Sequence, residues 1–417
     1  MFSLTSPISL LYNRKFAVFV ILCICTIVYI PIYNLDFQDA WDDQWVVINQ
    51  YTENGLSISN IKHILFDFYH GQYSPVNQFY YSAMYALNGY DPLLFHFCNL
   101  LVHLCNTVLV YLFIEKLMKA CGHDSAFCAK TSFLTTLLFS IHPIVVEPVS
   151  WLSASKILLY SLFYLLALLS YIDYMSTKRT GHYLLAMVYF ILSFGAKEQA
   201  VTLPVAFFIV DYFVKGKQYA LSGKVLLDKV PFLVLAFLFG ILTIYSQAYF
   251  GAGVLIDQKG YTLFQRLIFA SYAITEYLTK IIFPLRIHHL YPFPNNPGQA
   301  VPIRFYVYPV ALIIIIIYLI RNFTVNYIYF GICFFILHLI TCIHLIPMAR
   351  VAIVADRYAY ISAIGVLFPI SYYLAKFKQR AIAMRIIVLY CLFLSVYSYT
   401  RTSDWRNSTV LKNSINS

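Results

Sequence analysis

Residues 14–33 read RKFAVFVILCICTIVYIPIY, and shortly afterwards the chain continues with Gln38-Asp39-Ala40-Trp41-Asp42-Asp43-Gln44-Trp45. Two cations followed by an apolar run of this length predict a membrane-spanning helix with its basic end in the cytoplasm. The second stretch places three carboxylates and two tryptophans within eight residues, in a chain that is 61% hydrophobic and only 11% charged. We therefore expect these acids to form the mouth of a functional site where the first span leaves the membrane.

Long apolar runs recur about a dozen times along the 417 residues. They indicate an all-α polytopic membrane protein and exclude a soluble globular domain. The formal charge of +11 does not indicate a nucleic-acid partner, because the basic residues fall in short loops between spans, where they set orientation. We predict a cytoplasmic N-terminus, an external C-terminus and eleven spans, at about residues 16–33, 92–114, 131–143, 157–172, 183–196, 200–214, 230–249, 305–320, 327–347, 358–374 and 386–399.

Two long loops are predicted to lie outside the cell or in a lumen. Loop 34–91 contains the acidic stretch and, between residues 58 and 68, apolar residues at helical spacing that predict an amphipathic helix on the membrane surface. Loop 250–302 contains an apolar stretch with three charged residues, 263–284, which we interpret as an interfacial or re-entrant helix. The expected organisation is one transmembrane domain, 1–402, followed by a short external tail without repeats, 403–417.

With this topology, most of the unusual polar residues gather on the external side. A carboxylate at a lipid–water boundary can deprotonate an acceptor hydroxyl, while Lys and Arg stabilise a phosphate leaving group. The residues expected there are Asp39, Asp42, Asp43, His142, Glu147, Lys197, Glu198, Arg350, Asp356 and Arg357.

Six short motifs occur in an order that is familiar from one enzyme family. They are 41–45 (WDDQW), 73–75 (YSP) with 95–103 (FHFCNLLVH), 142–151 (HPIVVEPVSW), 196–204 (AKEQAVTLP), 356–360 (DRYAY) and 401–405 (RTSDW). Through these motifs the chain resembles the integral-membrane GT-C glycosyltransferases. More narrowly, it resembles the membrane part of the transmembrane and tetratricopeptide-repeat O-mannosyltransferases and their bacterial relatives.

The resemblance implies an inverting sugar transfer from a polyprenyl-phosphate-linked donor to an external acceptor, which is a protein hydroxyl, a glycan or a lipid. It implies that Asp42 acts as the base, with Asp43 as the alternative, and that Glu147 is a second carboxylate. The cations and histidine expected to hold the donor phosphate are Lys197, Arg357, Arg350 and His142. The residues expected to contact acceptor or sugar are Trp41, Trp45, Trp151 and Glu198. No cofactor is required; a divalent metal is compatible with the acids but is not predicted.

Each of these residues also has a purely structural interpretation. The acids suit a solvated turn, the tryptophans suit an interfacial belt, Lys197-Glu198 suits a local ion pair, and Arg357 suits an interfacial anchor. The chain departs from the family at Ser74, where relatives often carry Arg, and at Ser155-Lys156-Ile157, where relatives carry a cation followed by Asp. The alternatives to an enzyme are a transporter or lipid flippase and a catalytically inactive scaffold.

Overall fold

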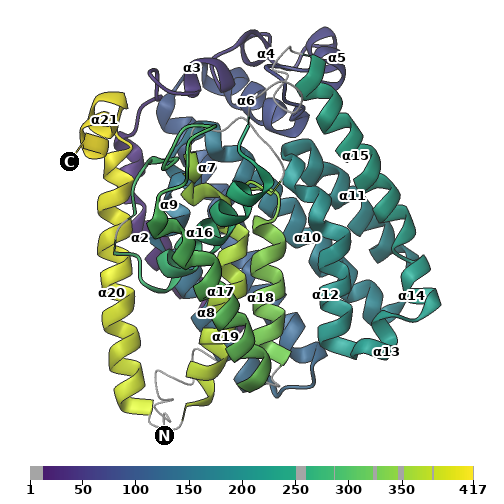
Figure 1. Cartoon of the computed structure of the whole chain (residues 1–417). Coiled ribbons are helices and arrows are strands. Elements are labelled where there is room, and N and C mark those ends of the chain that lie inside the picture. Colours follow the sequence, from purple (N-terminus) through teal and green to yellow (C-terminus); the bar gives the residue numbers. More distant parts are fainter. Residues whose placement is uncertain are drawn as a thin grey trace, which may run out of the picture.

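The computed structural model describes residues 13–249, 260–285, 287–322, 326–345, 352–377 and 380–416. Most of these residues are helical, which confirms the predicted all-α fold. Long helices run side by side as a bundle, and short helices cover its upper end (Figure 1). The bundle helices are α2 (Arg14–Val28), α7 (Pro92–Ala120), α8 (Ser125–Ser140), α10 (Ser155–Thr177), α11 (Thr180–Ala196), α12 (Leu203–Lys215), α15 (Val230–Tyr249), α18 (Asn326–Leu339), α19 (Ala359–Lys376) and α20 (Arg380–Asp404), and one further long helix, α17 (Val307–Asn322), stands beside the bundle.

Short helices and 3₁₀ turns connect the bundle helices. They are η1 (Ile30–Asn34), α3 (Asp43–Val46), α4 (Gln50–Glu53), α5 (Ile58–Phe66), α6 (Pro75–Asn88), η2 (Pro143–Val145), α9 (Val146–Ser150), η3 (Leu152–Ala154), η4 (Glu198–Thr202), α13 (Lys217–Ala220), α14 (Gly223–Leu227), α16 (Leu263–Ile282), η5 (Ile303–Tyr306), η6 (Asp356–Tyr358) and α21 (Ser408–Asn416). Within the described ranges, the strands are β1 (Tyr291–Pro292) and β2 (Ala352–Val354), which pair antiparallel.

Over its described residues, each of the eleven predicted spans overlaps one of these long helices, but fewer helices are long and apolar enough to cross a membrane. Among the described residues, six segments are long and apolar enough to cross a membrane, and a pair bent by 57°, Ser125–Ser140 with Pro143–Ser150, makes up to seven. The multi-pass character is therefore clear, whereas the number of eleven spans stays a prediction. The six segments are Arg14–Asn34, Pro92–Ala120, Leu152–Thr177, Gly223–Gln247, Asp356–Lys376 and Met384–Asp404.

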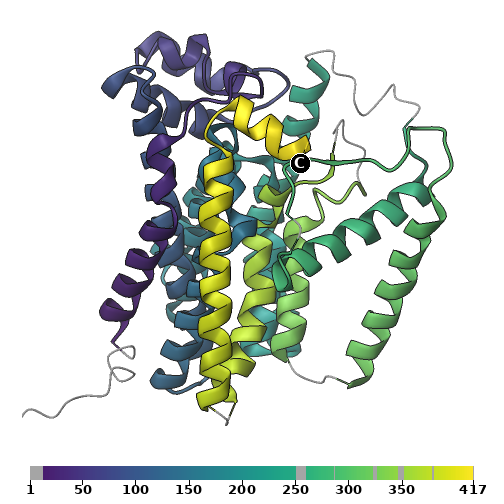
Figure 2. The same cartoon turned by 90° about the vertical axis from the view of Figure 1, so that its left-hand side faces the viewer.

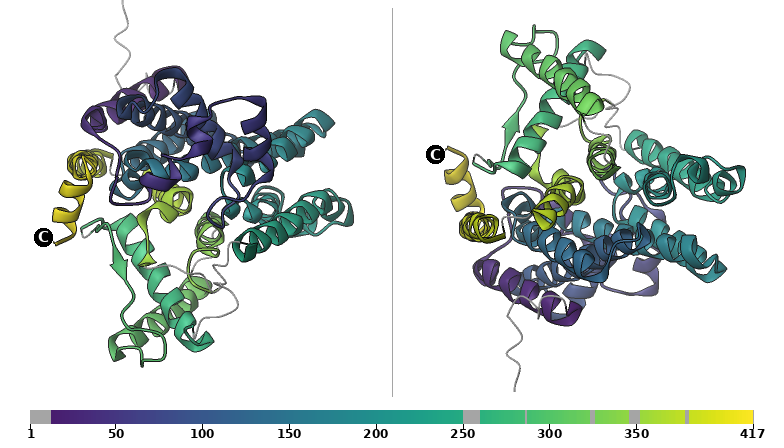
Figure 3. Two further views of the ribbon diagram at one scale, coloured as in Figure 1. Left: turned by 90° about the horizontal axis from the view of Figure 1, so that it is seen from above. Right: turned by 90° about the horizontal axis from the view of Figure 1, so that it is seen from below.

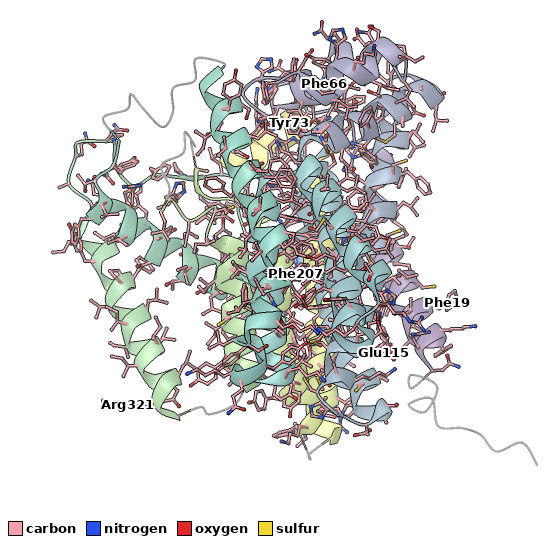
Figure 4. The ribbon with its side chains drawn as sticks, turned by 90° about the vertical axis from the view of Figure 1, so that its right-hand side faces the viewer. Phe19, Phe66, Tyr73, Glu115, Phe207 and Arg321 are labelled. Atoms are coloured by element: carbon pink, nitrogen blue, oxygen red, sulfur yellow. The ribbon has the colours of Figure 1, made fainter. Side chains whose placement is uncertain are left out.

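Bundle helices break into short turns at the upper end, and these breaks position the polar residues. After α8, Pro143 occupies the first turn of η2, where its missing N–H costs nothing, and the His142 ring caps that turn. After α11, Lys197 adopts an extended conformation before η4 begins. Phe66 and Tyr73 lie at this end of the molecule, and Glu115 and Arg321 lie at the opposite end (Figure 4).

The amphipathic helix predicted in loop 34–91 is present as α5. Ser57 caps it by accepting a hydrogen bond from the Asn60 N–H at 3.2 Å. Ile64 is buried beneath the helix, whereas Ile58 and Phe66 are each 77% exposed. The helix therefore turns an apolar surface outward at the upper end of the bundle.

Helix α16 takes a different direction from the bundle. It lies obliquely to the long helices (Figure 2) and, with α17, extends to one side of them (Figure 3). It begins with a reciprocal capping box between Thr262 and Gln265, and it is not among the six segments suited to span a membrane. This geometry fits the interfacial helix predicted for 263–284.

Two bundle helices meet with their backbones in contact. A Cβ atom added at Gly365 in α19 would lie 2.6 Å from the Gly331 carbonyl oxygen and 2.7 Å from the Phe335 nitrogen in α18. Small residues permit this close approach in membrane bundles, where packing rather than hydrophobic burial holds helices together.

Candidate active site

The acidic stretch folds into the short helix α3, and its two adjacent acids have opposite environments. Asp43 is completely buried. Its Oδ2 accepts a hydrogen bond from the Gln38 N–H at 2.9 Å, and its Oδ1 accepts from the Ser153 N–H at 2.9 Å and from the Ser153 hydroxyl. Asp42 precedes α3 and is half-buried. Among the residues that the structure describes, none donates a hydrogen bond to the Asp42 carboxylate.

These environments give the two carboxylates different chemistry. Burial raises the pKa of Asp43 to about 6, although the hydrogen bonds from Ser153 and Gln38 act in the opposite direction. All of its contacts fix the loop against η3. Asp43 therefore holds the loop in place, and Asp42 is the acid that remains available to a ligand.

Glu147 and Arg357 form a two-point contact. Arg357 donates from Nη1 to Glu147 Oε1 at 2.5 Å and from its backbone N–H to Oε2 at 2.9 Å. The Glu147 side chain is 5% exposed and the Arg357 side chain 25% exposed. Glu147 thus orients the Arg357 guanidinium and leaves one edge of it open.

Lys197 and Arg357, which the sequence assigns to one phosphate site, converge on the same aromatic ring. The Lys197 ammonium lies 5.8 Å from the centre of the Tyr358 ring, and the Arg357 guanidinium carbon lies 5.0 Å from it. Lys197 also pairs with Glu198 at 3.2 Å. The ion pair expected from their adjacency is therefore present.

Lys156 is a third basic residue near the site, and the sequence analysis did not assign it there. It lies in the first turn of α10, close enough to Lys197, Arg357 and Asp42 for their charges to interact. Its ammonium donates to the Gln72 side-chain oxygen at 2.9 Å. The sequence contained a signal for this residue, since Lys156 lies in the stretch where relatives carry a cation followed by Asp.

Two tryptophans, Trp41 and Trp151, connect the acidic loop to Arg357, and a third packs on Trp151. Trp41 contacts the edge of Trp151 at 6.2 Å, and Trp151 stacks on Trp405 at 5.6 Å. The Arg357 guanidinium lies 5.2 Å from the Trp151 ring centre. Trp41 and Trp151 therefore belong to the site, whereas Trp45 faces a neighbouring pocket.

The C-terminal segment, predicted as a separate tail, packs on the acidic loop. The Gln38 amide donates to the Trp405 carbonyl at 2.7 Å, and the Ala40 N–H donates to the Ser408 hydroxyl oxygen at 3.1 Å. Gln38 is also the residue whose N–H holds Asp43. The end of α20 and the start of α21 are therefore structural supports of the candidate site.

Two other residues expected to contact phosphate have a different placement. Both ring nitrogens of His142 are engaged, one by the Ile281 carbonyl at 3.0 Å and the other by the Ile144 N–H at 3.1 Å, so neither is free for a phosphate. Arg350 lies outside the described residues.

Asp356 is buried and accepts hydrogen bonds from Arg401 and Tyr291, and it thereby fixes the turn that carries Arg357. In the described part of the chain, His, Cys, Asp and Glu side chains form no group of three or more that could hold a metal ion.

Curated proteins with similar sequences share one description. Protein O-mannosyl-transferase TMTC2 from Homo sapiens is 31% identical over 150 residues, which cover 35% of this chain and 17% of that protein. Protein O-mannosyl-transferase TMTC4 from Mus musculus is 29% identical over 164 residues, or 36% of this chain and 22% of that protein. The chain is similar to protein O-mannosyl-transferases. The resemblance inferred from the six motifs is thereby confirmed.

The similarity has a limited extent. The matched region spans less than a quarter of each of these relatives, and no protein-family model matches the chain. An apo crystal structure of an oligosaccharyltransferase from Archaeoglobus fulgidus superposes on 93% of this chain and 56% of its own, with 13% identity and a TM-score of 0.48.

Proposed function

We propose that the chain is a GT-C glycosyltransferase that moves a sugar from a polyprenyl-phosphate-linked donor to a hydroxyl acceptor outside the cytoplasm. One observation carries this proposal. Asp42, a half-buried carboxylate to which no described residue donates a hydrogen bond, adjoins Trp41, and the Trp41 ring meets the Trp151 ring on which Arg357 lies. The relatives' description as O-mannosyl-transferases supports the reaction type.

The reaction is a direct displacement at the anomeric carbon. Asp42 takes the proton of the acceptor hydroxyl, the acceptor oxygen forms the new bond to the anomeric carbon, and the bond from that carbon to the phosphate oxygen breaks. The leaving polyprenyl phosphate keeps the electron pair. Lys156, Lys197 and Arg357 stabilise its negative charge, and one displacement inverts the configuration of the sugar.

The substitution Asp42→Asn tests the proposal, because Asn keeps the shape of the side chain but cannot accept the proton. We expect turnover to fall by roughly two to four orders of magnitude, the usual contribution of a general base. The assay uses the full chain in lipid nanodiscs, a radiolabelled short-chain polyprenyl-phosphate mannose or glucose, and a panel of peptide and oligosaccharide acceptors. Donor binding is measured in parallel and should not change, since the cations remain.

Asp39→Asn is the matched control. Asp39 is an exposed acid on the same loop, three positions away, and plays no part in the proposed reaction. Its variant should turn over like the parent. Full activity of Asp42→Asn would contradict the mechanism and return the transporter interpretation to first place.

A further inference from the structure

A pocket lies beside the acidic loop and outside the cation group. It is a cleft that is partly open to solvent rather than an enclosed cavity. Three aromatic residues and several uncharged polar residues line it; those used below are Trp45, Tyr51, Asp67, Tyr69, Gln72 and Gln78. No part of the proposed displacement uses this pocket.

A strained turn holds one wall of the pocket. Tyr69 and Gln72 exchange two backbone hydrogen bonds, at 3.1 and 3.0 Å, across His70 and Gly71. Both central residues have positive φ, 48° for His70 and 69° for Gly71, as a tight I′ turn requires. A non-glycine residue rarely adopts this conformation, and such strain is concentrated at functional sites. The turn sets Tyr69 and Gln72 side by side.

The aromatic rings present faces and edges at fixed angles. The Trp45 ring lies 4.9 Å from the His70 ring, and Tyr51 meets Tyr69 edge to face at 5.3 Å. Rigid rings of this kind can pack against an apolar C–H face of an otherwise polar ligand. Such a face is a property of a sugar ring.

The polar groups of the pocket suit a neutral, hydroxyl-rich ligand. The only acid among the lining residues that the structure describes, Asp67, is paired with His63 at 3.0 Å and accepts from the Tyr51 hydroxyl at 3.3 Å. Gln78 is fixed by its donation to the Thr52 hydroxyl at 2.8 Å. Amides and a partnered carboxylate can donate to and accept from sugar hydroxyls, but they offer no excess positive charge to a phosphate.

The pocket is joined to the candidate active site at two points. Gln72 lines the pocket and accepts a hydrogen bond from Lys156. Trp45 lies three residues after Asp42, and residues at this spacing are neighbours on a helix surface. A ligand packed on Trp45 is therefore close to the proposed base.

We propose that this pocket binds a neutral sugar unit of a glycan acceptor and presents one of its hydroxyl groups to Asp42. The inference rests on the proposed transferase function for its role, although sugar binding itself does not require the donor. An unmodified peptide acceptor fits the pocket less well, because the paired backbone of the Tyr69–Gln72 turn offers no free strand edge.

Equilibrium binding to the full chain in nanodiscs, without donor, tests the pocket. The probes are trisaccharides of mannose, glucose or N-acetylglucosamine and an unglycosylated Ser/Thr peptide. We expect at least one trisaccharide to bind, and we expect Trp45→Ala and the nearly isosteric Asp67→Asn each to weaken that binding by roughly tenfold. Phe66→Ala is the control, because it truncates an exposed aromatic on the same upper face that does not line the pocket.

Three results would overturn the inference: only the peptide binds, no trisaccharide binds, or both pocket variants bind a trisaccharide like the parent. A second measurement, hydrolysis of the donor by water, separates failure of the pocket inference from failure of the proposed function. The parent and Phe66→Ala should hydrolyse the donor, whereas Asp42→Asn should not, so donor hydrolysis without trisaccharide binding contradicts the pocket alone. A parent that neither hydrolyses nor transfers the donor would contradict the proposed function, while trisaccharide binding would still decide the role of the pocket.

Discussion

Glu147 accepts both the guanidinium and the backbone N–H of Arg357, at 2.5 and 2.9 Å. A carboxylate with both oxygens engaged by one residue is poorly placed to act on a substrate proton. Its contribution is geometric, because it fixes the plane of the guanidinium that the proposed mechanism directs at the donor phosphate. This relationship makes Glu147 a positioning residue and leaves Asp42 as the candidate base.

Replacing Glu147 by Gln should weaken donor binding. The amide oxygen can still accept from the guanidinium, but the amide NH₂ then faces the Arg357 N–H, so one of the two contacts is lost. We expect the donor dissociation constant to rise by roughly tenfold, the value of one charge-assisted hydrogen bond. Titration of a non-hydrolysable donor analogue measures this. The KM for the acceptor should stay at the parent value, and a change in acceptor KM alone would argue against the positioning role.

Lys156→Gln should also weaken donor binding, by roughly ten- to a hundredfold, because it removes a charge from the group that receives the phosphate. The same titration should give similar losses for Lys197→Ala and Arg357→Ala. Lys412→Gln, at an exposed position on α21, is the matched control. If Lys156→Gln binds donor like this control while the other two variants do not, Lys156 supports Gln72 rather than the phosphate.

The sequence predicted the fold better than it predicted the site. Apolar runs of helical length place the bundle helices correctly, because a chain in lipid must satisfy its backbone within each helix. The number of membrane-spanning helices could not be settled from composition, since short apolar helices such as Thr180–Ala196 and Tyr327–Leu339 are as apolar as longer ones. Oblique packing, as in α16, depends on contacts from distant parts of the chain.

At the site, spacing identified the acids and cations but not their partners. Nothing in the local sequence distinguishes Asp42 from Asp43, because Ser153, which buries Asp43, lies 110 positions away. Likewise, Trp405 and Trp151 are far apart in the chain, and only the fold stacks them. The place of Lys156 near the candidate site was predictable from the sequence, because this lysine stands where the chain departs from the family pattern.

The pH dependence of stability should report the burial of Asp43. Its pKa is about 6 in the folded protein and 3.8 in the unfolded chain. Between these values the folded state binds a proton that the unfolded state does not, so lowering the pH stabilises the fold. We expect the melting temperature of the parent to rise relative to that of Asp43→Asn as the pH falls from 7 to 5. A constant difference between the two proteins over this range would contradict the assignment.

The side of the membrane that carries the site can be measured directly. Asn296 is exposed in the loop that follows α16, and Arg179 is exposed between α10 and α11. In a background with the native cysteines replaced, Asn296→Cys should react with an impermeant maleimide in intact cells, and Arg179→Cys only after permeabilisation. The reverse pattern would place the candidate site on the cytoplasmic face.

The close approach of α18 and α19 predicts a large effect from adding a single methyl group. In Gly365→Ala the new Cβ would meet the Gly331 carbonyl oxygen and the Phe335 nitrogen, both backbone atoms that cannot rotate away. The helices must separate, which typically costs about 1–3 kcal/mol, and the melting temperature in detergent should fall. Gly240→Ala is the matched control, because Gly240 lies within α15 with no atom within 4 Å of its added Cβ. There alanine should be neutral or stabilising by about 0.5–1 kcal/mol, since it favours the helix. Equal melting temperatures for the two variants would show that the backbones of α18 and α19 do not touch at Gly365.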